Sequence, residues 1–406
     1  NSKNWKVQLK GAGETPYSRT ADGLAVLRSS IREYLCSEAM FHLGVPTTRA
    51  LSLSLSGDQV LRDVLYDGNP AYENGAIVCR TAPSFLRFGN YEIFAARNDV
   101  KNLKILVDYT LKHHFPELGT PSKRSYLQFF KKVSENTLDM ILHWQRVGFV
   151  HGVMNTDNMS ILGLTIDYGP YGWLEDFDFG WTPNTTDRQH KRYRYGNQPN
   201  MGLWNIYQLA NALYPLIEDA KPLEEILTQY PIDFEQKSLQ MMRSKLGLAT
   251  IDTNDLKLVQ ELEENLQLTA TDMTIFFRLL SDFKNHSLAL KNLESAFYNI
   301  DELTETVTMR WHTWFEKYEQ RLQMESRSHS ERKQQMDGVN PKYVLRNYMA
   351  QLAIEDADKG EYTLIDDLFE LLKKPYADQP KNHKWFAKRP DWAHEKIGCS
   401  MLSCSS

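Results

Sequence analysis

The residues best suited to phosphate chemistry in this sequence follow His151. The loop His-Gly-Val-Met-Asn-Thr-Asp-Asn ends in Asp157 and Asn158, and an Asp-Tyr-Gly sequence begins at Asp167. Residues 160–167 predict a short strand pair that would bring the oxygen atoms of Asn158 and Asp167 together. Mg²⁺ prefers a few protein oxygens of this kind, completed by phosphate oxygens. The alternative is structural, with Asp-Asn forming a turn and Asp-Tyr-Gly ending a hairpin.

The order helix, Asp-Asn loop, strand pair and Asp-aromatic-Gly is that of the protein-kinase catalytic loop and its metal-binding aspartate. The kinase base lies two residues after the histidine, where this sequence has Val153. Asp157 is the carboxylate of the loop that could accept a hydroxyl proton instead. A second Asp-Phe-Gly begins at Asp178 and competes for the metal. We favour Asp167 because it follows a predicted strand close to the loop, whereas Asp178 lies in a polar segment.

Positive side chains that could bind phosphates occur upstream. Lys10 ends a predicted strand and Glu33 lies in the following predicted helix, which is the order of the lysine and glutamate that position phosphates in kinases. A solvated lysine would give the same pattern. Arg80 and Arg87 lie where the strand-rich part joins the helix-rich part, and a guanidinium group can donate two hydrogen bonds to one phosphate. The alternative is two ordinary surface arginines.

Composition excludes several classes of protein. The chain has 406 residues, of which 42% are hydrophobic and 12% aromatic, so it can bury a large core and is neither disordered nor collagen-like. Its net charge of −5 argues against a main affinity for nucleic acid or anionic membrane. No membrane span is predicted, because the longest uncharged stretch, 195–217, contains several Asn and Gln residues. Four scattered cysteines indicate a reducing compartment.

The elements that must position these residues begin with a strand-rich segment. Alternating apolar and polar residues place Lys10 on the face opposite the apolar side chains. A helix of about twenty residues is expected between Gly23 and Gly44. Asp67-Gly68 is typical of a turn between strands. The predicted strands cover residues 5–10, 51–56, 59–66 and 75–81.

Helical patterns dominate after residue 83. An apolar stripe over 126–147 predicts a long helix that ends at Gly148 and leads directly into the loop. A polar, turn-rich segment over 168–199 precedes another helix. Residues 325–340 have the composition of a linker. The strand pair after the loop is expected over 160–162 and 164–167.

Several longer runs are more specific than these patterns. They are Leu-Lys-Gly-Ala-Gly-Glu-Thr-Pro-Tyr-Ser-Arg at 9–19, Asp-Gly at 22–23, Leu-Arg-Ser-Ser-Ile-Arg-Glu-Tyr at 27–34, Asn-Thr-Asp-Asn-Met-Ser at 155–160, Asp-Tyr-Gly-Pro at 167–170, Asn-Pro-Lys-Tyr at 340–343 and the final Ser-Cys-Ser-Ser. Together they resemble the selenoprotein O family of kinase-fold protein adenylyltransferases. The resemblance spans essentially the whole chain.

This resemblance implies that ATP binds in a flipped orientation and that AMP passes to a Ser, Thr or Tyr hydroxyl of a protein, with release of pyrophosphate. It implies Asp157 as the base and Asn158 and Asp167 as metal ligands. A flipped nucleotide would also explain Val153, because a base at the kinase position would face the wrong phosphorus. The residues that the resemblance and the kinase pattern assign to ATP are Lys10, Asp22, Gly23, Glu33, Arg80, Arg87 and Asp167.

We therefore predict an α+β, protein-kinase-like bilobal enzyme. Its expected parts are an N-terminal lobe over 1–90, a helical lobe over 91–335 that carries the loop and metal site, and a C-terminal helical extension over 336–406. It would use ATP and Mg²⁺, or Mn²⁺, and act on proteins, not on nucleic acid or membranes. The alternatives are a conventional kinase-like phosphotransferase and an inactive nucleotide-binding scaffold. The expected location is the bacterial cytoplasm, or the mitochondrion in a eukaryote.

Some features lie outside this core prediction. The family's glycine-rich Gly-Asp-Gly-Arg segment precedes the lysine strand, and nine residues precede Lys10, so the natural protein is expected to extend upstream. Cys404 stands where some relatives have selenocysteine; it could bond a redox partner, pair with Cys399 or remain unreactive. The basic run 188–195 could contact a protein substrate or RNA, although a solvated loop is commoner. His151 is expected to be buried and to shape the loop by hydrogen bonding.

Overall fold

The strands of the first part of the chain form a three-stranded antiparallel sheet in the order β1, β3, β2. β1 (Lys6–Lys10) and β2 (Arg49–Arg62) pair with opposite edges of β3 (Ala71–Ala82). The register places Gln8 opposite Arg80 and Lys10 opposite Val78, which brings the predicted lysine and arginine to the same end of the sheet. The computed structural model describes residues 5–16, 18, 20–64, 66–396, 398–399 and 401–403.

β2 is one strand of 14 residues, so the prediction of separate strands over 51–56 and 59–66 is wrong. The pairing register shifts between Leu55 and Gln59, and Gly57 has a φ of 87°. An irregularity of this kind lets a strand continue through residues that interrupt the alternation. The predicted turn before β3 is confirmed, and the Gly68 amide donates to Asp63 Oδ2 at 2.8 Å.

Helix α1 (Leu27–His42) packs against β2 and β3. Leu27, Ile31 and Leu35 are buried at intervals of four residues, which is one face of a helix. The helix ends before Gly44, which has a φ of 75°, as predicted. It begins later than predicted because the chain before it is extended, with an isolated bridge between Val26 and Gly75.

The alternation in β1 identifies a strand but not the face that is covered. Val7 and Leu9 are 64% and 57% exposed, whereas Gln8 and Lys10 are on the more covered face. The expectation that Lys10 lies opposite the apolar residues is confirmed, but these apolar residues are not buried. The covered face of β1 is polar because it contributes to the candidate site described below.

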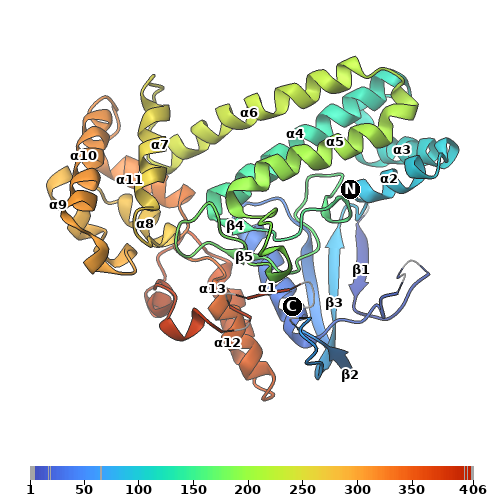
Figure 1. Cartoon of the computed structure of the whole chain (residues 1–406), viewed down its shortest axis with the longest axis horizontal. Coiled ribbons are helices and arrows are strands. Elements are labelled where there is room, and N and C mark those ends of the chain that lie inside the picture. The colour runs from blue at the N-terminus through green and yellow to red at the C-terminus, as the bar shows by residue number, and fades with distance from the viewer. Residues whose placement is uncertain are drawn as a thin grey trace.

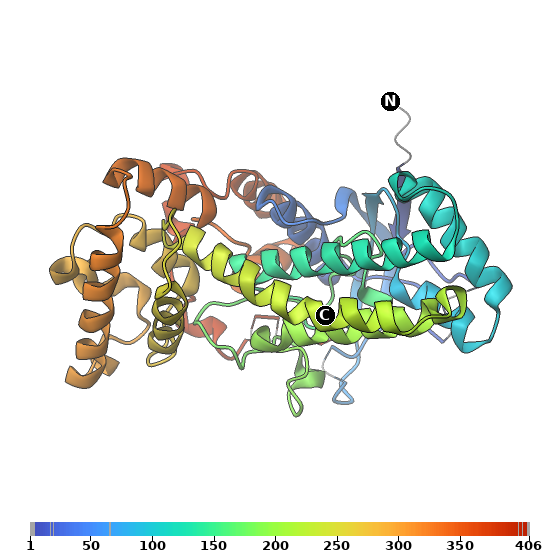
Figure 2. The same cartoon turned by 90° about the horizontal axis from the view of Figure 1, so that it is seen from above.

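Three long helices run side by side in both views of the molecule (Figures 1 and 2). They are α4 (Lys123–Val147), α5 (Gln198–Ile217) and α6 (Lys221–Lys245). α4 begins after the capping residue Ser122 and ends at Gly148, whose φ is 74°. The predicted helix and its stop are confirmed, and the chain passes from Gly148 directly into β4 (Phe149–Val150) and the loop at His151.

The other helices extend the structure at both ends. α7 to α11 form a separate group with its own apolar core, which lies at the left of Figure 1. α12 and α13 return to contact α1 near the sheet. The bounds are α2 (Phe88–Ala96), α3 (Val100–His114), α7 (Asp255–Leu266), α8 (Met273–Leu280), α9 (His286–Asn292), α10 (Glu305–Leu322), α11 (His329–Val339), α12 (Asn347–Ala357) and α13 (Thr363–Leu372).

The strand pair predicted over 160–162 and 164–167 is not formed. Ser160 bridges to Arg87 and Thr165 bridges to Thr47, so each half pairs with the N-terminal part of the chain instead of with the other half. A turn at Gly163, whose amide donates to the Ser160 carbonyl at 3.1 Å, separates the halves. β4 pairs with β5 (Gly172–Trp173) instead.

The linker predicted over 325–340 is also wrong, because most of it forms α11. Ser328 and Glu331 make a capping box at its start, a signal that the sequence contains. Met336 is buried, and Asn340 donates to the Lys245 carbonyl at 2.8 Å. The segment is polar because one face of α11 is exposed, not because the chain is unstructured there.

Within the part of the chain that the structure describes, no helix combines the length and apolar character needed to cross a membrane.

Candidate active site

Ionic contacts connect Lys10, Glu33 and Arg80 on three different elements. Lys10 Nζ contacts Glu33 Oε2, and Glu33 Oε1 accepts a hydrogen bond from Arg80 Nη1 at 3.0 Å. Glu33 is buried on α1, and Arg80 is buried on β3. The Arg80 Nε also donates to Gln8 Oε1 of the neighbouring strand at 2.9 Å. Glu33 therefore joins the strand lysine to a buried arginine.

Asp167 is held by both predicted arginines. Arg80 Nη1 lies 2.9 Å from Asp167 Oδ1, and Arg87 Nε lies 2.7 Å from Oδ2. Arg87 Nη2 donates to Oδ1 at 3.0 Å, so Arg87 binds the carboxylate with two nitrogens. Asp167 has a φ of 59°, a left-handed conformation in which few non-glycine residues occur. Five charged side chains from β1, α1, β3 and two loops thus form one continuous network.

The charges around Asp167 determine its ionisation. Burial alone would raise the pKa of Asp167, but the charges of Arg80, Arg87 and Lys10 outweigh burial and hold this pKa well below its usual range. For Arg80, burial opposes the charged form, while Glu33 and Asp167 raise its pKa above the usual value. Asp167 is therefore an anion at neutral pH, as a carboxylate that binds a cation must be.

The loop after His151 is fixed from several sides. His151 is buried, as predicted, and its Nε2 lies 2.8 Å from the carbonyl oxygen of Ile166, next to Asp167. Burial lowers the pKa of His151, which favours its neutral form. Gly152 has a φ of 80°, and a Cβ on it would lie 2.2 Å from the Pro170 carbonyl oxygen. The start of the loop therefore packs directly on the segment that contains Asp167.

The end of the loop carries the predicted base and amide ligand. The Asn158 side chain donates through Nδ2 to the Val153 carbonyl at 3.0 Å, which leaves its Oδ1 as the atom that could bind a cation. Asp157 is exposed, in a 3₁₀ turn over Thr156–Asn158. The backbone of this region pairs with the start of α2, because the Phe88 amide donates to the Met159 carbonyl at 3.0 Å.

Asp22 and Gly23 lie outside the ionic network. Arg62 Nη1 and Nη2 donate to the two Asp22 carboxylate oxygens at 2.7 and 2.9 Å. This hydrogen-bonded pairing with Arg62 lowers the pKa of Asp22. Gly23 has a φ of 69°, and a Cβ there would lie 2.2 Å from the Gly13 carbonyl oxygen. Asp22 and Gly23 lie in the loop between β1 and α1, so any contact that they make with ATP would come from this loop.

The competing aspartate, Asp178, has a local role. Its Oδ1 accepts a hydrogen bond from the Gly180 amide at 2.6 Å. The neighbouring Phe179 ring stacks on Tyr195, with centroids 5.9 Å apart. Among the described residues, the aspartate that joins the arginine network is Asp167, which favours it over Asp178 as the phosphate-side carboxylate.

The donor set suits a divalent cation only with help from a nucleotide. Within the described residues, no group of three His, Cys, Asp or Glu side chains that could hold a metal ion is found. The predicted ligands are one amide oxygen and one carboxylate, and Asp167 Oδ2 accepts one of the hydrogen bonds from Arg87. A carboxylate oxygen has two acceptor positions, so Oδ2 can also bind a cation. Phosphate oxygens would have to complete the coordination shell, which is usual for Mg²⁺.

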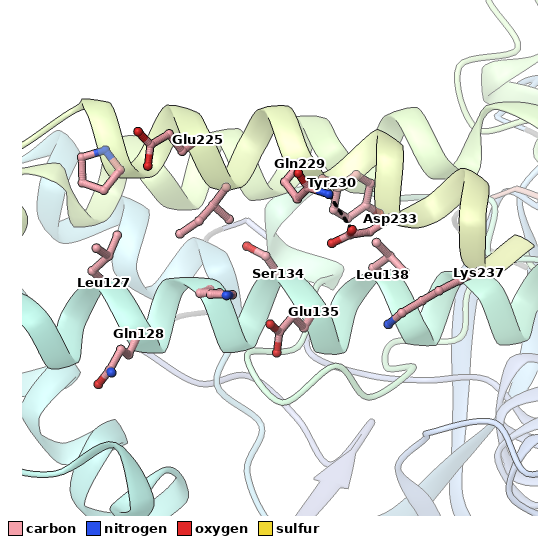
Figure 3. A pocket seen from close by; sticks show the side chains of 13 residues that line it. Leu127, Gln128, Ser134, Glu135, Leu138, Glu225, Gln229, Tyr230, Asp233 and Lys237 are labelled. Carbon is pink, nitrogen blue, oxygen red and sulfur yellow. Dashed lines mark hydrogen bonds between the residues drawn. The ribbon is translucent and has the colours of Figure 1, made fainter.

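A hollow in the helical part is separate from this network. A cavity of about 420 Å³ lies between α4 and α6. Figure 3 shows its lining residues, among them Glu135, Tyr230 and Asp233. None of the predicted site residues lines it. This cavity is therefore not part of the charged site.

The sequence patterns did not identify Gln8 and Glu92 as residues of the site. Gln8, which accepts from Arg80, precedes Lys10 by two residues and shares its strand face, so the period of two could have identified it. Glu92, which accepts from Thr156 Oγ1 at 2.6 Å, gives no comparable signal, because nothing in the sequence brings α2 to the loop.

Comparison with known families identifies the chain. Residues 1–373 match the family described as protein adenylyltransferase SelO. The chain belongs to the SelO family. The predicted resemblance is confirmed, and as a SelO family member the protein is an enzyme, a nucleotidyltransferase that acts on proteins.

Bacterial relatives of the same SelO type are similar over nearly the whole chain. The "protein nucleotidyltransferase YdiU" of Flavobacterium johnsoniae is 63% identical, with 100% of this chain and 78% of the relative aligned. The protein of the same name from Rhodopirellula baltica is 53% identical, with 100% and 79% aligned. That of Aromatoleum aromaticum is 53% identical, with 99% and 77% aligned.

Proposed function

We propose that this SelO family member transfers AMP from ATP to Ser, Thr or Tyr hydroxyls of proteins, in a site formed by the Lys10–Glu33–Arg80–Asp167–Arg87 network and the loop that carries Asp157. The observation that supports this site best is the bracketing of Asp167 by Arg80 and Arg87. Three cations and two carboxylates leave an excess of one positive charge, which attracts a polyphosphate.

The reaction is a displacement at the α-phosphorus. The substrate hydroxyl oxygen forms a bond to the α-phosphorus, the bond from that phosphorus to the bridging oxygen of the β-phosphate breaks, and pyrophosphate leaves with the electron pair. The hydroxyl proton passes to the carboxylate of Asp157, a residue exposed at the surface. Val153 at the usual kinase base position has no group that could accept this proton.

The three positively charged side chains have separate roles. Arg87 is partly exposed and binds Asp167 through two nitrogens, so it can transfer its hydrogen bonds to phosphate oxygens without leaving the site. Arg80 is buried and anchored by Glu33 and Gln8, so it contributes a fixed positive charge. Lys10 is oriented by Glu33. Asp22 and Gly23 would contact ATP from the loop between β1 and α1.

A divalent cation, Mg²⁺ or Mn²⁺, would be held by Asn158 and Asp167. When bound, it would neutralise phosphate charge and orient the α-phosphate. The wider arrangement that we propose is the kinase-like bilobal fold, with the sheet and α1 in the lobe over 1–90, the loop and metal site in 91–335 and a helical extension over 336–406.

We propose the bacterial cytoplasm as the location, in keeping with the bacterial relatives. We also propose that Cys404, which lies outside the described residues, forms a disulfide with a redox partner. Cys399 is buried, and burial raises its pKa to about 12, so as placed it is a poor nucleophile.

Labelled ATP tests the reaction. The protein is incubated with a protein acceptor and Mg²⁺, using ATP labelled at either the α- or the γ-phosphate. We expect label on protein from the α position only, together with release of pyrophosphate, and mass spectrometry should find AMP on Ser, Thr or Tyr. Label retained only from the γ position would instead indicate a phosphotransferase. No transfer of either label, with ATP still bound, would indicate a scaffold.

A further inference from the structure

The first turn of α2 lies directly against the side chain of Asp157. A Cβ placed on Gly89 would lie 2.2 Å from Asp157 Oδ1 and 3.3 Å from its Cγ. Real Cβ atoms essentially never come as close as 2.2 Å to another heavy atom, so a side chain here would force the carboxylate, the flexible end of Asp157, to move. The carboxylate of Asp157 therefore occupies the space that a side chain at position 89 would fill.

The backbone does not require glycine at this position. Gly89 is a residue of α2 and does not belong to the described glycines with positive φ. An alanine at an interior helix position is more favourable than glycine by about 1 kcal/mol, and by less in a first turn. Glycine at position 89 is thus a poor choice for the helix alone, and the contact that accounts for it is the one with Asp157.

A second contact on the same face of α2 holds the preceding loop residue. Glu92 follows Gly89 by three residues, which is close to one helical turn. Its Oε2 accepts a hydrogen bond from Thr156 Oγ1 at 2.6 Å. Two consecutive loop residues, Thr156 and Asp157, are therefore in contact with one face of this helix.

The start of α2 is also fixed to the rest of the site. The Ile161 amide donates to the Leu86 carbonyl at 3.0 Å, and Phe88 pairs with Met159 on the other side of Arg87. The Arg87 side chain binds Asp167 from the same short segment. Movement of α2 would therefore displace Asp157 and Arg87 together.

We propose that Gly89 and Glu92 are positioning residues that fix the carboxylate of Asp157 at the site of hydroxyl attack, Gly89 by leaving space and Glu92 by holding Thr156. This inference rests on the proposed role of Asp157 as the base. It assigns to α2 a function in aligning the acceptor hydroxyl, separate from the function of Arg87 at the phosphates.

Substitution of Gly89 separates positioning from folding. Gly89→Ala should keep or raise the unfolding temperature, because alanine favours the helix, and should leave the KM for ATP unchanged. Its kcat for AMP transfer to protein should fall roughly 10- to 100-fold, since a displacement of about 1 Å at the reacting groups has an effect of this size. The matched control is Gly338→Ala in α11, where a Cβ meets nothing within 4 Å, and its kcat should not change.

Glu92 provides an independent variant. Glu92→Ala removes the acceptor for Thr156 and should lower kcat with an unchanged KM for ATP, whereas Glu92→Gln retains an acceptor oxygen and should restore most of the activity. Full activity of Gly89→Ala or of Glu92→Ala would overturn the positioning role of that residue. A lower unfolding temperature of Gly89→Ala would also overturn it, because the glycine would then serve the fold.

Asp157→Asn distinguishes this inference from the proposed function. If Asp157→Asn loses AMP transfer while Gly89→Ala and Glu92→Ala remain active, the base is correct and the positioning role is wrong. If Asp157→Asn remains active, Asp157 is not the base. The proposed role of Gly89 and Glu92 in positioning that base is then also wrong.

Discussion

Arg80 donates from a single nitrogen, Nη1, to both Glu33 at 3.0 Å and Asp167 at 2.9 Å. A buried guanidinium group thus lies between the Glu33 carboxylate of α1 and the Asp167 carboxylate, which follows the loop at His151. Each of these acids is shared with a second cation, Glu33 with Lys10 and Asp167 with Arg87, so the buried charge of Arg80 depends on both acids being ionised and in place. Arg80 thereby connects β3 to both α1 and the segment that contains Asp167.

Replacing Glu33 should damage both stability and activity. Glu33→Gln removes the negative charge shared by Lys10 and Arg80, and Arg80 then remains buried with one carboxylate instead of two. We expect the free energy of unfolding in urea to fall by about 2–3 kcal/mol and AMP transfer to be lost. Glu117→Gln, at an exposed position, is the control. Unchanged stability of Glu33→Gln would mean that Arg80 does not depend on this charge.

Replacing Arg87 should affect nucleotide use more than folding. Arg87→Lys keeps the positive charge but cannot reach both oxygens of Asp167. Loss of a hydrogen bond to a charged group predicts a decrease in kcat/KM for ATP of roughly 10- to 100-fold, measured by transfer of α-labelled AMP. The exposed Arg97→Lys variant should retain full activity. Wild-type kinetics for Arg87→Lys would show that Arg87 does not contribute to the use of ATP.

The two Asp-aromatic-Gly sequences should behave differently. Asp167→Asn removes an anion that two arginines bind, so AMP transfer should fall at least roughly 100-fold. Asp178→Asn should retain most of the activity, because an asparagine oxygen can still accept from the Gly180 amide. The reverse ranking of the two variants would assign the metal to Asp178.

The metal requirement of AMP transfer should depend on Asn158. Chelation with EDTA should abolish AMP transfer, and added Mg²⁺ or Mn²⁺ should restore it. Asn158→Ala should raise the Mg²⁺ concentration needed for half-maximal activity by roughly 10-fold or more, the loss found even for groups that only support a ligand. Asn292→Ala, at an exposed position, should leave the metal requirement unchanged. An unaltered Mg²⁺ requirement in Asn158→Ala would exclude its amide as a ligand.

Stability should decrease in weak acid because of His143. Burial, assisted by the nearby charge of Arg146, lowers the pKa of His143 on α4 to about 4. An unfolded histidine titrates near pH 6.5, so the unfolded state binds the proton first as the pH falls. Stability is therefore retained above about pH 6.5 and is lost progressively down to pH 4.

His143→Gln measures this contribution. His143 is only partly buried, so solvent screening reduces its contribution. The free energy of unfolding lost between pH 7 and pH 5 should be on the order of 1 kcal/mol smaller in His143→Gln than in the natural protein. Urea unfolding at both pH values gives the difference. His190→Gln, which changes an exposed histidine, should show the same pH dependence as the natural protein. Equal pH dependence in both variants would exclude His143 as the cause.

Local patterns were sufficient for several parts of this protein. Apolar residues at helical spacing and a glycine stop predicted α1 and α4, because a helix end and an apolar stripe are properties of the segment itself. The loop before Asn158 and the family membership were also recognisable from sequence, since both depend on consecutive residues. The buried, hydrogen-bonded state of His151 was predicted as well.

Contacts between distant segments were decided only by the tertiary structure. The polar face of β1 is covered, and its apolar face is exposed, because Gln8 and Lys10 face a charged partner on α1 and β3. Residues 160 and 165 pair with the N-terminal part of the chain, a choice that their own alternation cannot reveal. Arg87 reaches Asp167, and Gly89 makes space for Asp157, because packing joins segments about seventy to eighty residues apart. Sequence periodicity reports which face of an element is apolar, whereas packing decides what each face meets.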